Sequence, residues 1–208
     1  MGRRKHLLIS SKNKVILIFN IWKLQGNKMK KSLKLASLSV ATIALAGTAV
    51  AEEELLVPGF GAGQDVPGAF NAPDPNTEYK VLFDLVIDDE DLSDPYPMLP
   101  LIAGYVNTLG NFGVPAENRK IAIVLHRGSG LIGLTNEAFK ERHDGKDNPN
   151  IELIQKLAAA GVTFHMCGQG VKARNLTKED LLPEIQIDYW ALTTLIELGR
   201  QGYVQIGG

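Results

Sequence analysis

The sequence predicts an α/β fold: a three-layer α/β/α sandwich built on a mainly parallel sheet of about five strands. One observation is that strand-like and helix-like segments alternate along residues 78–208, which is the order that builds parallel sheets. Another is that segments 121–125 and 162–166 are apolar throughout, instead of alternating between apolar and polar residues. Continuous apolar strands are typical of a parallel sheet that helices cover on both faces.

The expected elements have recognisable boundaries. Thr135 suits the N-terminal cap of a helix, Asn148-Pro149-Asn150 precedes the next helix, and Gly161 ends it. The segment 177–180 is expected to begin a helical turn. Strands are expected at 80–87, 120–125, 162–166, 185–187 and 203–206, and helices at 97–109, 135–143, 151–160 and 189–198.

The first 51 residues contain ten Lys or Arg and no Asp or Glu, which sets them apart from the rest of the chain. Residues 29–34 are a short basic start, residues 35–50 are apolar, and Ala49-Val50-Ala51 is a small-residue cleavage pattern. This order predicts a secretory signal peptide at 29–51. An uncleaved membrane anchor is less favoured, because the apolar run is short for a membrane span and three glutamates follow at once.

Since a signal peptide begins at the N-terminus, residues 1–28 are interpreted as a gene-model extension ahead of a true start at Met29. The exported part, 52–208, has 157 residues, enough for one domain with its own core. It divides into a Gly- and Pro-rich leader, 52–77, without regular structure, and a domain, 78–208. We therefore expect a periplasmic or secreted protein with no membrane contact after the signal is removed.

The exported part is acidic. It carries 12 basic and 23 acidic residues, a net charge of −11 that the whole chain's −1 conceals. Nucleic acids and anionic membranes bind basic surfaces, so neither is an expected partner. The acidic segment 88–91 suggests a cation site, although a solvated loop is the simpler interpretation.

Cys167, the only cysteine, follows directly on the predicted strand 162–166. Ligands and chemistry gather at the carboxyl ends of strands in open α/β sheets. A lone cysteine in an exported protein has no internal disulfide partner, which leaves a buried structural cysteine, a disulfide between chains or a free reactive thiol. The expected turn Gly168-Gln169-Gly170, with Lys172 and Arg174 nearby, would stabilise a thiolate or persulfide anion.

Two histidines are candidate partners of Cys167. His165 shares a strand face with Cys167, because residues i and i+2 point the same way, but a satisfied core histidine is the simpler interpretation. His126 ends the preceding predicted strand and is the better candidate for a base or thiolate partner. No metal-ligand spacing joins these residues, so no metal or other cofactor is expected.

The segment Gly128-Ser129-Gly130-Leu131-Ile132-Gly133 matches the GxGxxG pattern of dinucleotide-binding proteins. The helix that should open at once is delayed to about Thr135. No strand ending in Asp or Glu follows about twenty residues later. The segment is therefore interpreted as a glycine-rich loop at the active site.

Several segments in a fixed order resemble the DsrE-like (DsrE/DsrF/TusD) proteins, especially their periplasmic members of unknown role. The cysteine after a Gly-Val strand is the most specific of them, and together they span nearly all of 78–206. The segments are Tyr79-Lys80-Val81-Leu82-Phe83-Asp84, Val124-Leu125-His126, Asn148-Pro149-Asn150, residues 157–162 running on to Cys167-Gly168-Gln169, Ala191-Leu192-Thr193-Thr194, and Gln201-Gly202-Tyr203.

The resemblance implies an α/β/α fold, homo-oligomers that are often trimers or hexamers, and, in cytoplasmic sulfur-relay members, a cysteine that carries persulfide sulfur. Cys167 occupies the place of that cysteine, and Arg174 that of an arginine which follows it. Family members commonly have His-Gly where this chain has His126-Arg127-Gly128. Arg127 is thus an insertion that adds positive charge near the thiol.

The resulting hypothesis is an exported, sulfurtransferase-like carrier that binds or transfers sulfur through Cys167. Its partners would be copies of itself and a sulfur donor or acceptor protein. The alternatives are a non-catalytic oligomer that binds a small ligand, and a thiol redox sensor. The reactive residues are predicted to be Cys167 and His126, supported by Gly168, Gln169, Gly170, Arg127, Arg174 and His165.

Overall fold

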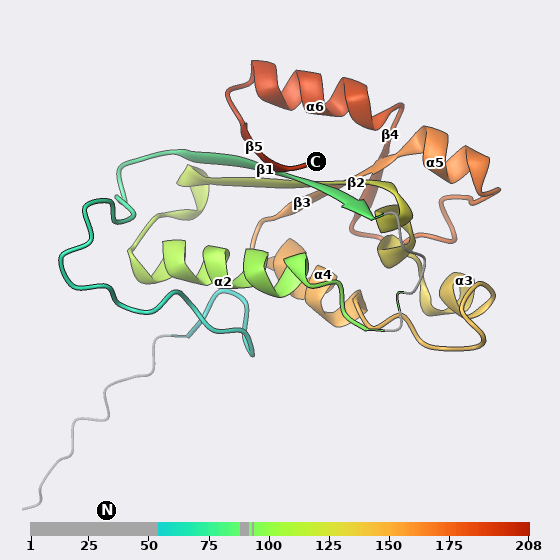
Figure 1. Cartoon of the computed structure of the whole chain (residues 1–208), viewed down its shortest axis with the longest axis horizontal. Helices are drawn as coiled ribbons and strands as arrows, with labels where there is room; N and C mark the ends of the chain where they lie inside the picture. Colours follow the sequence, from blue (N-terminus) through green and yellow to red (C-terminus); the bar gives the residue numbers. More distant parts are fainter. Residues whose placement is uncertain (1–53, 88–91, 93) are drawn as a thin grey trace, which may run out of the picture. The chain divides into compact units, whose positions relative to one another are not determined.

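The computed structural model describes residues 54–87, 92 and 94–208, and the predicted α/β sandwich is confirmed. The strands are β1 (Tyr79–Ile87), β2 (Arg119–Arg127), β3 (Thr163–Cys167), β4 (Ile185–Asp188) and β5 (Val204–Gly207). They form one parallel sheet in the order β4-β3-β2-β1-β5 (Figure 1). Because all five strands run the same way, their carboxyl ends meet at one edge of the sheet.

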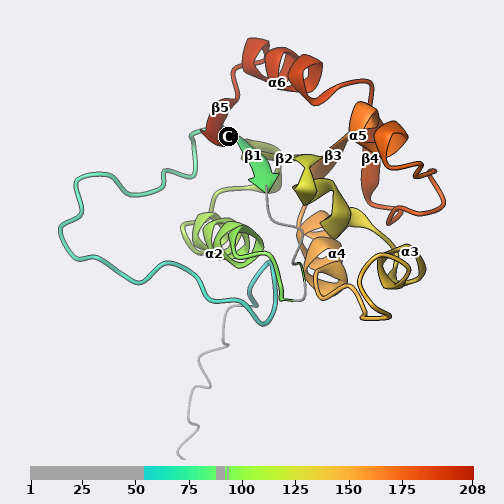
Figure 2. The same ribbon diagram turned by 45° about the vertical axis from the view of Figure 1, so that its right-hand side comes forward.

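Helices cover both faces of this sheet (Figures 1 and 2). Helices α2 (Met98–Asn111) and α4 (Ile151–Ala159) lie on one face, and α6 (Ala191–Arg200) lies on the other. The shorter helices are α3 (Asn136–Lys140), α5 (Gly168–Ala173), and the 3-10 helices η2 (Ala116–Asn118) and η3 (Gly128–Gly133). Among the residues described, no helix has the length and apolar character needed to cross a membrane.

The sheet separates two apolar clusters. In β2, Ile121, Ile123 and Leu125 belong to the cluster on the side of α2 and α4, whereas Ala122 and Val124 belong to the cluster beneath α6. Successive strand residues point to opposite faces, so a strand that is buried on both sides is apolar at every position. The smaller cluster also contains Leu82, Cys167, Ala191 and Leu198.

The leader is fixed to the domain through α2. Asn107 is fully buried; its Oδ1 accepts a hydrogen bond from the Val57 amide at 2.7 Å, and its Nδ2 donates to the Phe60 carbonyl at 2.7 Å. Lys156 of α4 lies 5.7 Å from the centroid of the Phe60 ring and pairs with Glu152, which lowers the pKa of that carboxyl. The described part of the leader, 54–77, has no helix or strand. Side chains of the domain and turns within the leader bind part of its backbone instead.

Two glycine-rich segments differ from the expectation. Gly168-Gln169-Gly170 is not an open turn; it forms the first residues of α5. The segment 128–133 is not an open loop; it forms the 3-10 helix η3. In both cases the close packing of the carboxyl edge holds the flexible glycines in helical geometry, although glycine alone favours turns.

Two further expectations change in detail. Thr135 caps α3 as predicted, with its Oγ1 accepting from the Ala138 amide at 3.3 Å, but the helix ends at Lys140. The expected helical turn at 177–180 is instead closed by a side chain, because Asp180 Oδ2 accepts from the Thr177 amide at 2.7 Å. The predicted extension 1–28, signal peptide 29–51 and acidic loop 88–91 lie outside the described residues.

Candidate functional site

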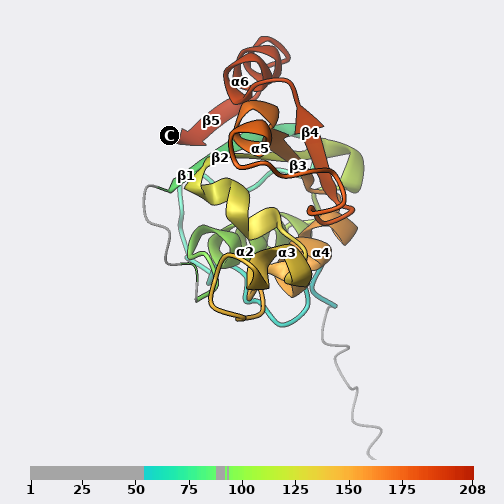
Figure 3. The same cartoon turned by 90° about the vertical axis from the view of Figure 1, so that its right-hand side faces the viewer.

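Cys167 lies at the carboxyl end of β3, on the sheet face that α6 covers. Its register partner on one side is Asp188, at the end of β4. On the other side Leu125 pairs with Met166, and this register places His126 of β2 next to Cys167, one residue further along. The three residues therefore form a row across adjacent strands. Figure 3 looks onto this end of the molecule, where α5 leaves β3.

A small cavity adjoins the thiol. Cys167 is 7% exposed and occupies the N-cap position of α5. The cavity measures about 10 Å³, which is the space that one water-sized group fills. His126, Arg127 and Arg174 line it together with Cys167 and Gly170, and none of the described lining residues is acidic. Arg127 and Arg174 therefore supply positive charge at the cavity.

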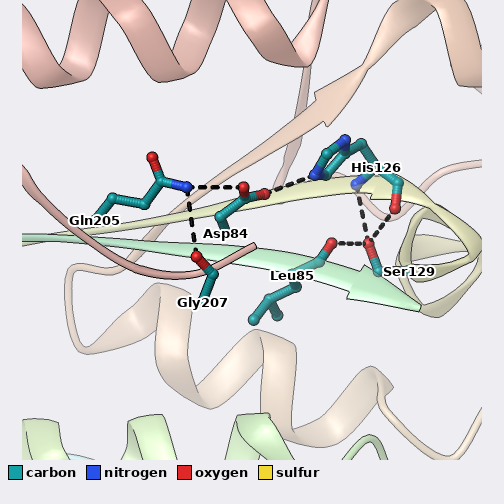
Figure 4. A network of polar contacts seen from close by, with 6 residues as sticks. All are labelled: Asp84, Leu85, His126, Ser129, Gln205 and Gly207. Carbon is teal, nitrogen blue, oxygen red and sulfur yellow. Dashed lines mark hydrogen bonds and ion pairs between the residues drawn. The ribbon is translucent and has the colours of Figure 1, made fainter.

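His126 is held by a carboxylate from the neighbouring strand (Figure 4). Its Nε2 lies 2.6 Å from Asp84 Oδ1, and Asp84 is only 5% exposed. The other carboxylate oxygen accepts a hydrogen bond from Gln205 Nε2 at 3.0 Å. Ser129 Oγ accepts from the His126 amide at 2.9 Å, which fixes the backbone where β2 turns into η3. The position of the imidazole is thus set by β1, β5 and η3 together.

His165 has a second and separate network. Its Nδ1 lies 3.0 Å from Asp188 Oδ2, and its Nε2 lies 3.2 Å from Thr163 Oγ1. Thr194 of α6 donates to the same Asp188 oxygen at 2.6 Å. Both ring nitrogens of His165 are engaged, so the network acts as a tie between β3, β4 and α6. The simpler interpretation of His165, a satisfied core histidine, fits this geometry.

The structure brings some of the predicted site residues together and keeps others apart. Five of them line the thiol cavity, namely Cys167, His126, Arg127, Gly170 and Arg174. Gln169 is not among the lining residues; its Nε2 donates to the Tyr189 carbonyl at 3.0 Å and so ties α5 to the segment before α6. The described residues contain no group of three or more His, Cys, Asp or Glu side chains arranged to hold a metal ion.

Gly168 supports the site through close packing. A Cβ at this position would lie 2.5 Å from the Asp188 carbonyl oxygen, which is closer than real Cβ atoms approach. The end of β4 can therefore approach the first turn of α5 only because residue 168 is glycine. This contact keeps the backbone after Cys167 close to the strand that carries Asp188.

Sequence reasoning missed Asp84 and Gln205. Asp84 is an acidic residue in the middle of the otherwise apolar segment 81–87, and this interruption is a signal that a buried carboxylate has a partner. Nothing in the sequence around Gln205 marks it as a partner of a buried carboxylate. Its role depends on β5 lying beside β1, where Leu82 pairs with Gln205.

These features define an α/β protein with one thiol at the carboxyl edge of a parallel sheet, next to a histidine. The chain belongs to the DsrE/DsrF-like family, whose model matches residues 100–206, just over half of the chain. β1 and its Asp84 precede the matched residues. A search of curated proteins found no match. Among solved structures, the chain is similar to a protein of unknown function, MTH1491 from Methanobacterium thermoautotrophicum, with a TM-score of 0.39 and 19% identity over 62% of this chain and 97% of that chain.

Proposed function

We propose that this protein is an exported sulfur carrier that binds or transfers sulfur as a persulfide on Cys167. The observation that carries the proposal is the cavity of about 10 Å³ beside the thiol, with His126, Arg127 and Arg174 around it. A persulfide adds one sulfur atom to the thiol and is readily anionic, so both the size of the cavity and its positive surroundings suit it. Membership of the DsrE/DsrF-like family suggests a sulfur-relay-related role.

Thiosulfate illustrates the chemistry that such a site supports. The Cys167 thiolate attacks the outer sulfur of thiosulfate and a new S–S bond forms. The S–S bond of thiosulfate breaks, and sulfite leaves with the bonding electron pair. In the return step an acceptor thiolate attacks the outer sulfur of the persulfide, and Cys167 leaves as a thiolate. Neither step needs an external oxidant.

The alternatives receive less support. The cavity of about 10 Å³ is too small to enclose a ligand of several atoms, so a small-ligand-binding role at Cys167 has no enclosed pocket to support it. A sulfur donor needs to place only its outer sulfur there. A thiol redox sensor would share the reactive cysteine but would form a sulfenic acid or an intermolecular disulfide in place of a persulfide. The predicted signal peptide, 29–51, supports export.

We expect the purified protein to gain the mass of one sulfur atom when it is incubated with thiosulfate or polysulfide, and to lose it on treatment with dithiothreitol. Intact-protein mass spectrometry measures the change. Cys167→Ser should not gain the mass, and iodoacetamide should alkylate Cys167 in the folded wild-type protein. A folded protein whose thiol resists both iodoacetamide and the sulfur donors would contradict the sulfur and redox roles together.

We also propose that the protein forms homo-oligomers, as a trimer or hexamer. The support is an apolar patch on and before α6, which we call the α6 patch. Leu192 and Ile196 lie one helical turn apart and are exposed, and Tyr189 and Trp190 precede them on the chain. Exposed apolar patches of this kind usually mark interaction surfaces. A second copy of the chain is the proposed partner.

A further inference from the structure

The Asp84–His126 pair lies next to the thiol, and its geometry determines which nitrogen of the imidazole carries the proton. Ionised Asp84 can only accept hydrogen bonds, and its Oδ1 lies 2.6 Å from His126 Nε2. In neutral His126 the proton must therefore be on Nε2, which leaves Nδ1 as a lone-pair acceptor. Within the described residues, His126 Nδ1 makes no hydrogen bond that competes for this lone pair.

The carboxylate is itself held in place. Gln205 Nε2 donates to Asp84 Oδ2 at 3.0 Å, and the last strand brings Gly207 close enough that a Cβ there would lie 2.7 Å from the Asp84 carbonyl oxygen. Asp84 is 5% exposed, so its attraction for an imidazolium is only weakly screened by water. The C-terminal strand β5 thus completes a support that begins on β1.

We propose that Asp84 is a positioning residue that makes His126 the base for Cys167. This inference rests on the proposed function, because it concerns how the same thiol is activated. Cys167 and His126 line the same cavity of about 10 Å³, the space of one water. The S–H bond of Cys167 breaks, its proton passes through a water in this cavity to His126 Nδ1, and the electron pair stays on sulfur. The resulting thiolate lies across the cavity from an imidazolium whose positive charge the Asp84 carboxylate stabilises. The arrangement is that of a nucleophile, a base and an orienting carboxylate, assembled on three parallel strands.

The second histidine–carboxylate pair provides an internal contrast. In the His165–Asp188 pair, Nδ1 contacts Asp188 and Nε2 contacts Thr163, so no nitrogen is left to receive a proton from Cys167. The two pairs lie on the same face of the sheet, on either side of the thiol. Of these two pairs, as the described part of the chain shows them, only Asp84–His126 has a free acceptor, and this difference makes Asp188→Asn a matched control.

Asp84→Asn separates a positioning role from a structural one. The side-chain amide that this substitution introduces can donate to His126 Nε2 while its oxygen accepts from Gln205, so every hydrogen bond is kept. The donation forces the imidazole proton onto Nδ1, where it blocks the base. We expect the rate of Cys167 alkylation by iodoacetamide at neutral pH to fall about tenfold or more. Asp188→Asn removes a carboxylate beside the same thiol but leaves His126 untouched, so it should not slow alkylation.

Two further measurements make the test decisive. Asp84→Asn should slow alkylation no further in a His126→Gln background, because Asp84 acts through His126. Nitrogen-15 NMR of the wild-type protein should find the proton of neutral His126 on Nε2. The proposal fails if that proton is on Nδ1, and this reading does not depend on whether any variant folds. It also fails if the two substitutions slow alkylation independently, or if Asp188→Asn slows it as much as Asp84→Asn.

Failure of the positioning role of Asp84 can be distinguished from failure of the sulfur-carrier role of Cys167. If wild-type Cys167 takes up no sulfur from thiosulfate or polysulfide while Asp84→Asn still slows alkylation, the base assignment stands and the carrier role falls. If the persulfide forms but Asp84→Asn changes neither alkylation nor the rate of sulfur uptake, the carrier role stands and the positioning role of Asp84 falls.

Discussion

Arg127 places a side chain at a backbone position that suits glycine. Its φ of 54° and ψ of −134° lie in a region that residues with a Cβ rarely adopt. The next residue, Gly128, cannot carry a side chain unless the backbone shifts, because a Cβ there would lie 2.6 Å from the Ile87 carbonyl oxygen. Arg127 therefore brings positive charge to the thiol cavity and introduces backbone strain.

We expect Arg127→Gly to be more stable than Arg127→Ala. Both variants lose the guanidinium and its contacts, so their difference reports the backbone alone. At an ordinary position alanine is favoured over glycine by about 0.5–1 kcal/mol; here relief of strain should reverse the order, with glycine ahead by about 1 kcal/mol. Urea unfolding of the two variants measures the difference. An alanine variant as stable as the glycine variant would show that this backbone is unstrained.

The residues proposed to be reactive could be placed at one edge of the sheet from the sequence because they stand at strand ends. Cys167 and His126 each follow an apolar run, and the carboxyl ends of parallel strands meet at one edge. Asp84 could not be assigned in this way, since its contact with His126 depends on β1 and β2 being neighbours. An alternation of strands and helices predicts a parallel sheet, but it does not determine the strand order that brings these side chains together.

The first residue of helix α5, Gly168, lies so close to the end of β4 that no side chain fits there. A Cβ on Gly168 would collide with the backbone, at 2.5 Å from the Asp188 carbonyl oxygen. A Cβ on Gly170 would meet the end of the flexible Arg174 side chain at 3.3 Å and the Cys167 Cβ at an ordinary 4.0 Å. Two glycines in one helix therefore have different roles. The first allows the helix to approach β4, and the second is replaceable.

Gly168→Ala should accordingly destabilise the protein, whereas Gly170→Ala should not. We expect Gly168→Ala to lower the free energy of unfolding by about 1–3 kcal/mol, because the end of β4 must move away from α5. Gly170→Ala should be neutral or raise it by up to about 1 kcal/mol, since alanine is the better helix former. Thermal and urea unfolding measure both. Equal losses in the two variants would contradict the backbone contact at residue 168.

The helices and strands were predictable where the spacing of apolar residues follows a single period, either that of a helix or that of a strand. The five strands agree with the expected ranges to within two residues, because each contains apolar or β-branched residues that stop at a recognisable boundary. Helices α5 and η3 were missed, because their glycines have low helix propensity. Packing at the carboxyl edge overrides that propensity, and packing is not visible in a local sequence window.

At the scale of the whole molecule, the outer sides of helices α2 and α6 differ in what covers them. α2 receives the leader, which covers part of it through Asn107 and Val57. α6 covers the other face of the sheet, and its outward side chains Leu192 and Ile196 are exposed. Burial of this α6 patch against a second copy would remove apolar surface from water and stabilise the assembly.

Ile196→Glu tests this surface. Ile196 is 62% exposed, so a glutamate there costs little in an isolated subunit but places a charge inside an interface between copies. We expect the wild-type protein to elute as an oligomer in size-exclusion chromatography with light scattering, and Ile196→Glu to shift it towards the monomer. Leu101→Glu is the matched control, because Leu101 is 58% exposed on α2, at the opposite face. A wild-type protein that is monomeric at micromolar concentration, or a Leu101→Glu variant that dissociates equally, would rule out the α6 patch as the contact between subunits.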